Sequence, residues 1–244
     1  MKSSKLNWFA RRAELNSSAA KSLLATLEDN SRLNTALFAE AWPLQEFKLI
    51  QAWQHSRMTE DYADFTAQED YLPAVNFFLS ELYGDFGFVD RNQDIYRVYP
   101  VMVKLLPAAM LDTLTAALEF QAHSLELDMQ MTESLVALHP EINRVGQLDL
   151  GLYIDINRQC VAEKDRRTQV GGVVSLGKSL VKVADHGVLL RLLKMMRMPA
   201  RAAGFGQLQA FLEQGLSAFR QMPDADYFLH AVSQRETTFI DKLY

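Results

Sequence analysis

The 244-residue sequence has a single cysteine, Cys160, and only seven prolines and eleven glycines to interrupt regular structure. One cysteine excludes an internal disulfide and any metal site that needs several thiolates. Such low cysteine usage is typical of a reducing compartment, so we expect a cytoplasmic protein. No segment shows the sustained alternation of apolar and polar residues that marks a half-buried strand.

Long hydrophobic runs are also absent. The most apolar region, Val98 to Leu118, is interrupted by two prolines and two charged residues, so we expect no membrane span. The N-terminus, Met1 to Arg12, carries four basic residues and too few apolar ones for the core of a signal peptide.

Apolar residues recur at helical spacing along most of the chain, with proline and glycine between the segments. The predicted helices cover about residues 17–42, 44–53, 59–82, 94–106, 107–139, 142–162, 168–184, 188–196, 207–220 and 224–243. The last five are predicted to be separated at Gly171-Gly172, Gly187, Met198-Pro199, Gly204 and Pro223. We therefore predict an all-α fold, a single-domain bundle of about eight to ten helices over residues 1–244, with residues 1–15 as a loosely attached N-terminal segment.

Residues 172–179, GVVSLGKS, match the phosphate-binding pattern G-x-x-x-x-G-K-[ST]. That loop needs a buried strand before it, but the preceding residues 163–169 are mostly polar and charged. Val173 and Leu176 continue with Leu180 as a helical apolar face. We therefore predict a helix here, and a nucleotide ligand is not expected.

Six carboxylate and histidine residues are candidate ligands for a metal site inside a helical bundle, five because of their helical spacing and Glu81 because it is an acid within an otherwise apolar helix. They are Glu81, Glu119, His123, Glu126, Asp226 and His230. The Glu-x-x-His pair of ferritin-like proteins is absent, and the same spacings also fit ordinary pairs on a helix surface. No cofactor is favoured, and a di-iron or other metal-dependent oxidase that uses these carboxylate and histidine ligands, with iron as its metal, is the alternative function.

Basic residues gather in the Arg158–Arg201 region. Ten Lys or Arg against four acids give Gly151 to Gly204 a charge of +6, within a chain whose total is −5. This region either meets an acidic protein partner or forms a solvated surface. The net negative charge and the lack of interleaved aromatic residues argue against nucleic acid.

The segment from Phe77 to Arg97 joins aromatic bulk to charge. Its aromatic half is predicted to be core, and its charged half to form a network that closes a loop over two helix ends. A polar binding pocket is the second interpretation. Its candidate residues are Tyr83, Asp90, Arg91, Asp94 and Arg97.

Residues 77–84, FFLSELYG, resemble the signature of the bacterial FFLEELY-motif proteins, an uncharacterised family. Ser80 stands where that signature has Glu. The resemblance extends over most of the chain and implies a bacterial, cytoplasmic protein that forms one unit, without implying an activity or catalytic residues. The function expected from these observations is binding, interaction or regulation.

Overall fold

All regular secondary structure in the described residues is helical, which confirms the all-α prediction. The structure is a computed structural model that describes residues 2–82, 87–106, 108–142, 146–184, 187–202 and 206–244. Within these ranges, the side chains that are not described are those of residues 2–16, 81–82, 87–93, 101, 105, 187–189, 192, 196, 199–200 and 207. Its elements are α1 (Lys2–Leu37), α2 (Leu44–Asp61), α3 (Ala63–Thr66), α4 (Leu72–Phe77), the π-helix η1 (Phe78–Leu82), α5 (Gly87–Leu105), α6 (Ala108–Leu138), α7 (Leu150–Cys160), α8 (Glu163–Ala184), α9 (Gly187–Ala202), α10 (Gly206–Gln221) and α11 (Ala225–Leu243). Nine of these described elements have seven residues or more, within the predicted range.

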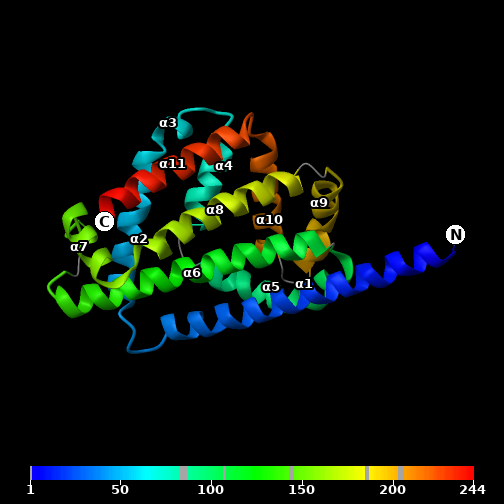
Figure 1. Ribbon diagram of the computed structural model, residues 1–244, viewed down its shortest axis with the longest axis horizontal. Helices are drawn as coiled ribbons and strands as arrows, with labels where there is room; N and C mark the ends of the chain where they lie inside the picture. The colour runs from blue at the N-terminus through cyan, green and yellow to red at the C-terminus, as the bar shows by residue number, and fades with distance from the viewer. Residues whose placement is uncertain (1, 83–86, 107, 143–145, 185–186, 203–205) are drawn as a thin grey trace.

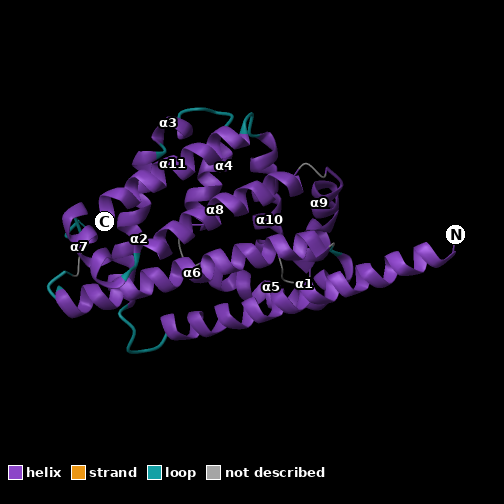
Figure 2. Cartoon of the chain, in the orientation of Figure 1, coloured by secondary structure: helices purple, strands orange, loops and turns teal. Residues whose placement is uncertain are grey.

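The long helices are stacked side by side. Figure 1 shows α1, α6, α8 and α11 in that order across the molecule, and each packs on the next. Helix α2 crosses behind this layer near the C-terminus, where it meets α6 and α11. The first turns of α1 project beyond the bundle as a direct continuation of the helix. Figure 2 shows short loops between the helices, and among the described residues no helix is long and apolar enough to span a bilayer.

The Phe77-Phe78 pair is core, as predicted, with both side chains 3 % exposed. Phe77 packs edge-on against Phe219, and Phe78 packs against Phe228. The pair therefore joins α4 and η1 to both α10 and α11. The predicted core residues Leu82 and Phe88 have side chains outside the description.

The glycines predicted to break the chain at Gly171-Gly172 lie inside α8, so that prediction is wrong. A Cβ atom built on Gly172 would lie 3.3 Å from Cδ2 of Phe120 on α6, so the glycine fits a close approach of the two helices. A glycine inside a helix costs about 1 kcal/mol relative to alanine, and tertiary packing outweighs that cost here. The residues of the GVVSLGKS match accordingly have a helical backbone, and the predicted apolar face is confirmed by buried Val173 and Leu176.

Three other boundaries differ from prediction. Helix α9 continues through Pro199 to Ala202, so this proline lies in the last turn of the helix and not after its end. Helix α5 begins at Gly87, seven residues before the predicted start at residue 94. Helix α7 begins only at Leu150, where the Asp149 side chain caps it by accepting a hydrogen bond from the Leu152 amide.

Candidate functional site

The charged half of the Phe77–Arg97 segment is only partly described. Tyr83 lies outside the described residues, as do the side chains of Asp90 and Arg91. Asp94 is 7 % exposed, and its Oδ1 lies 3.6 Å from Nη1 of Arg97, one turn further along α5. The predicted binding pocket at these five residues therefore stays a prediction.

The structure does not gather the described members of the predicted metal set. Glu119 and Glu126 are exposed on α6, and Nε2 of His123 lies 3.1 Å from the Asp165 carbonyl oxygen of α8. Asp226 and His230 are exposed on α11, and α8 lies between α6 and α11 in Figure 1. No group of three or more possible ligands forms within the described part of the chain. The side chain of Glu81 is outside the description, so iron binding by the full set stays untested.

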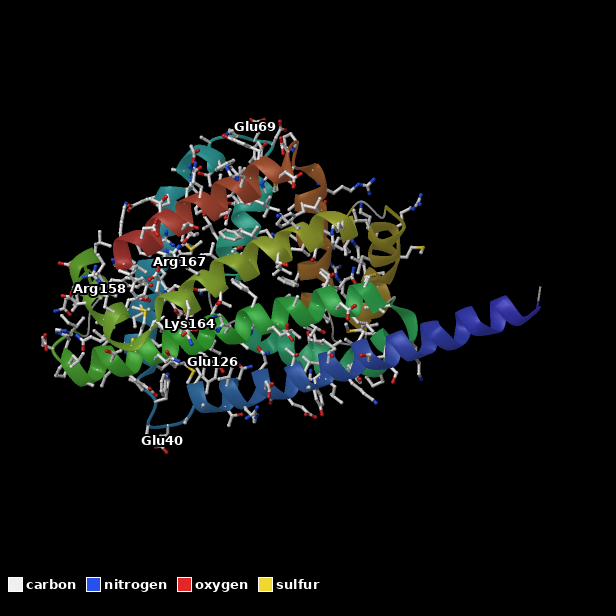
Figure 3. The ribbon with its side chains drawn as sticks, viewed as in Figure 1. Glu40, Glu69, Glu126, Arg158, Lys164 and Arg167 are labelled. Atoms are coloured by element: carbon white, nitrogen blue, oxygen red, sulfur yellow. The ribbon has the colours of Figure 1, made fainter. Side chains whose placement is uncertain are left out.

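The basic region divides into a surface part and a buried residue. Figure 3 labels Arg158, Lys164 and Arg167 where α7 meets α8. Arg167 is engaged by Glu163 and Asp241, each with a nitrogen–oxygen distance of 2.7 Å. Arg166 is only 5 % exposed and faces the interior, so it cannot meet a partner at the surface. The interpretation of the region as one basic surface is therefore wrong at Arg166.

Arg166 belongs to a buried group of polar side chains where α2, α6, α7, α8 and α11 meet. We call this group the polar cluster. It consists of Gln54, Arg57, Asp128, Tyr153, Asn157, Arg166 and Glu236. Burying so many polar groups costs free energy unless they form hydrogen bonds with one another. The cluster has two halves, and hydrogen bonds connect the residues within each half.

The first half is an ion pair between α2 and α11. Arg57 donates from Nη2 and Nη1 to the two Glu236 carboxylate oxygens at 2.7 and 3.2 Å. The Tyr62 hydroxyl donates to Glu236 Oε1 at 3.0 Å, and Asp61 accepts a further bond from Arg57 at 2.8 Å. Burial alone would lower the pKa of Arg57, but the adjacent Glu236 carboxylate more than offsets this and raises it above its ordinary value. Arg57 is therefore a fixed cation.

The second half connects α2 and α6 to α7 and α8. Gln54 Nε2 donates to Asp128 Oδ1 at 2.9 Å and to the Tyr153 hydroxyl at 3.1 Å. Arg166 donates from Nε to Asn157 Oδ1 at 2.9 Å and reaches the Tyr153 hydroxyl at 3.5 Å. Burial raises the pKa of Asp128, and the nearby Arg166 charge and the Gln54 bond only partly oppose it. Asp128 therefore keeps its proton to a higher pH than an exposed aspartic acid does.

A surface groove lies over the cluster, between α2 and α11. We call it the α2–α11 groove. It has a volume of about 650 Å³ and is lined by Trp53, Ser56, Arg57, Glu60, Asp61, Leu150, Gln234, Arg235, Thr238, Phe239 and Lys242. A small cavity of about 40 Å³ lies deeper, among residues of the cluster, and Arg57 and Phe239 line both spaces. These two side chains form the wall between the surface and the interior.

Aromatic rings form much of this wall. Trp53 stacks on Tyr153 with 4.0 Å between ring centroids and an interplanar angle of 18°. The Phe239 ring centroid is 6.2 Å from that of Trp53, and the Arg57 guanidinium carbon lies 4.1 Å above the Phe239 ring. Any ligand in the groove would therefore contact an aromatic surface backed by hydrogen-bonded polar groups.

No sequence motif marks these residues, and Arg57 and Glu236 were not among the predicted site residues. The signal that could have found them is a charge inside an apolar helical stripe. Arg57 follows Ile50 and Trp53 at helical spacing, and Glu236 lies between Val232 and Ile240. Such charges face the core and must be paired there.

Comparison with known proteins places the chain in a family without assigning an activity. No curated protein matches the sequence, and no solved structure matches it. The sequence profile of a domain of unknown function (DUF8198) matches residues 19–244, which include every residue of the polar cluster and the groove. The chain therefore belongs to the DUF8198 family.

Proposed function

We propose that the protein is a binding protein whose ligand is a small amphipathic organic anion held in the α2–α11 groove. The observation that carries this proposal is the volume of the groove, about 650 Å³, beside the hydrogen-bonded polar cluster with which it shares Arg57. Small-molecule sites commonly have volumes of about 300 to 1,000 Å³ and combine apolar walls with a few fixed polar groups.

The aromatic wall favours a ligand with a flat apolar body. Trp53 and Phe239 line the groove, and Leu150 at its edge is 46 % exposed. Flat apolar groups stack well on such rings, and their transfer from water to this surface is favourable.

The charges in the groove favour an acidic group on that ligand. Arg235 is satisfied by two bonds of 2.7 Å to Asp64, whereas Lys242 makes no ion pair with any residue that the structure describes. Helices α2 and α11 are antiparallel, because Trp53 lies beside Phe239 and Arg57 binds Glu236. Lys242 and the acidic Glu60 therefore lie toward opposite ends of the groove. A carboxylate or phosphate would therefore lie at the Lys242 end, with the apolar body over Trp53.

Binding of the amphipathic aromatic anion anilinonaphthalene sulfonate tests this proposal. With Trp8 and Trp42 replaced by phenylalanine, Trp53 is the one remaining tryptophan, and energy transfer from it to the probe reports occupancy of the groove. We expect Lys242→Glu to weaken binding about tenfold, a loss of about 1.4 kcal/mol. Ser56→Arg, which places a long side chain at the exposed rim of the groove, should prevent the probe from binding and so abolish energy transfer from Trp53.

The matched control is Lys182→Glu, the same charge change at an exposed position on α8. It should leave the dissociation constant unchanged. Equal weakening by the Lys242 and Lys182 variants would mean that only net charge matters, and the groove would be rejected as the site.

A second candidate function is interaction with an acidic protein through α9, the exposed end of the basic region. Met195 and Met198 are 70 % and 73 % exposed, more than any other large hydrophobic side chain described. Arg191, Lys194 and Arg201 are also exposed on this helix, whose sequence contains no acid. Exposed methionines beside basic residues suit an acidic amphipathic partner.

Poly-L-glutamate is a suitable probe of the acidic-partner function. Reversal of Arg191, Lys194 and Arg201 to Glu should abolish its binding, whereas reversal of Lys164, Lys178 and Lys182 on α8 serves as the charge-matched control. Equal losses in the two triple variants would contradict a site on α9. The resemblance of residues 77–84 to the FFLEELY-motif proteins further supports a role in the bacterial cytoplasm.

A further inference from the structure

A second cavity lies in the other half of the bundle. It has a volume of about 120 Å³, and its lining shares no residue with the α2–α11 groove. Side chains from α4, α5, α6, α8, α9 and α10 surround it. The lining includes Phe77, Met102, Met110, Thr113, Ala117 and Leu216.

The lining of this cavity is apolar. Thr113 is the one residue among those lining it with a polar side chain, and its hydroxyl already donates to the Ala109 carbonyl oxygen at 2.9 Å. A buried water molecule needs two to four polar partners, roughly three on average. The cavity therefore offers no favourable place for water, whereas an apolar molecule would lose no hydrogen bond on entry.

One wall is held rigidly. Phe77 packs so closely on Gly215 of α10 that a Cβ atom there would lie 2.5 Å from the Phe77 Cζ. The opposite lining includes Met102 and Met110, whose unbranched side chains adapt to the shape of a neighbour. A fixed aromatic wall with adaptable neighbours suits a small guest of variable shape.

We propose that this cavity binds a small apolar group about the size of benzene, either a ring or a short hydrocarbon chain. Native interiors are close-packed, so an apolar space of this size is unusual. An engineered apolar cavity of about 150 Å³, slightly larger than this one, binds benzene and xenon. The FFLSELYG segment thereby gains a role, because its first residue, Phe77, forms the wall of the site.

Methionine methyl NMR during titration with benzene tests the proposal on the intact chain. The Met102 and Met110 methyl resonances should shift on saturation, while those of the exposed Met195 and Met198 stay in place. Unchanged Met102 and Met110 resonances, or shifts of all four alike, would overturn the proposal.

Variants of the cavity sharpen this experiment. Ala117→Leu should fill the space and weaken benzene binding at least about tenfold, whereas Leu216→Ala should enlarge it and strengthen binding. If Ala117→Leu fails to fold, Leu180→Phe tests the same filling from α8. A filled variant that binds benzene as tightly as the parent would exclude the cavity as the site.

Hexanol, titrated in parallel, distinguishes a chain from a ring. Tighter binding of hexanol than of benzene at the same two methionines would assign a chain-shaped guest, and the reverse a ring.

Binding of anilinonaphthalene sulfonate, measured by energy transfer from Trp53, should be the same in the Ala117→Leu variant as in the parent. This control separates failure of the cavity proposal from failure of the proposed ligand site in the α2–α11 groove. Loss of both probes together in that variant would contradict an independent second site.

Discussion

Arg57 and Glu236 form a two-point ion pair across the contact between α2 and α11, at 2.7 and 3.2 Å. Their side chains are 15 % and 9 % exposed, so water screens the pair little. A buried ion pair of this kind is weak evidence for stability, because desolvation of both charges offsets their attraction. It does fix the relative position of the two helices that form the groove.

Replacement of Glu236 by glutamine should destabilise the protein strongly. The change leaves the Arg57 charge buried with one partner fewer, and removal of one member of a buried pair costs about 3 kcal/mol or more. Urea unfolding followed by circular dichroism should therefore show a midpoint shifted to lower urea, with an unchanged slope.

Asp61 provides the matched control for the Glu236 prediction, because it binds the same Arg57 at 2.8 Å while remaining 42 % exposed. Asp61→Asn should cost less than about 1 kcal/mol, as exposed pairs usually do. The combined change Arg57→Met with Glu236→Leu should cost less than Glu236→Gln alone. A double variant less stable than the single one would show that the pair itself stabilises the fold.

Asp128 should make stability depend on pH. Burial raises the pKa of this carboxyl above its ordinary value of 3.8, so the folded protein holds the proton more tightly than the unfolded chain. The free energy of unfolding should therefore fall as the pH rises from about 3.8 through the raised pKa.

Asp128→Asn should remove this pH dependence while keeping an oxygen that accepts the Gln54 bond. Urea unfolding from about pH 4 to about pH 8 should show the variant gaining stability relative to the parent as the pH rises. A constant difference across that range would mean that Asp128 does not titrate there.

Two glycines of α8 should respond oppositely to alanine. A Cβ atom on Gly171 would have nothing within 4 Å, so Gly171→Ala should stabilise the helix by about 1 kcal/mol. A Cβ atom on Gly177 would lie 2.3 Å from Cδ2 of the buried Leu229, so Gly177→Ala should destabilise by about 1 kcal/mol or more. Thermal unfolding of the two variants checks the signs, and stabilisation by both would show that Leu229 moves aside without cost.

The helix spacing predicted most of the fold because the apolar stripes are long and regular. Pro223, for example, lies between α10 and α11 as expected. The failures came where a breaker residue is accommodated by its surroundings. Gly172 fits the close approach of Phe120, and Pro199 occurs in the last turn of α9. Neither condition can be seen in the local sequence.

The site was less predictable than the fold, since it depends on which helices meet. Arg166 counted as a surface charge in the sequence analysis, although Val170 and Val173 follow it at helical spacing and share its buried face. Its bond to Asn157 and its approach to Tyr153 join α8 to α7. Spacing can show that a charge faces inward, but only the packing of helices identifies its partners.

Asp224 and Asp226, two residues apart at the start of α11, should contribute unequally to stability. The Asp224 side chain caps the helix by accepting a hydrogen bond of 2.8 Å from the Tyr227 amide. Its replacement by alanine should therefore cost about 1 kcal/mol. Asp226 is exposed in the first turn and interacts favourably only with the helix dipole, so Asp226→Ala should cost about 0.5 kcal/mol or less. Urea unfolding of both variants in metal-free buffer measures the difference. Equal losses, or a larger loss at Asp226, would contradict the capping role of Asp224.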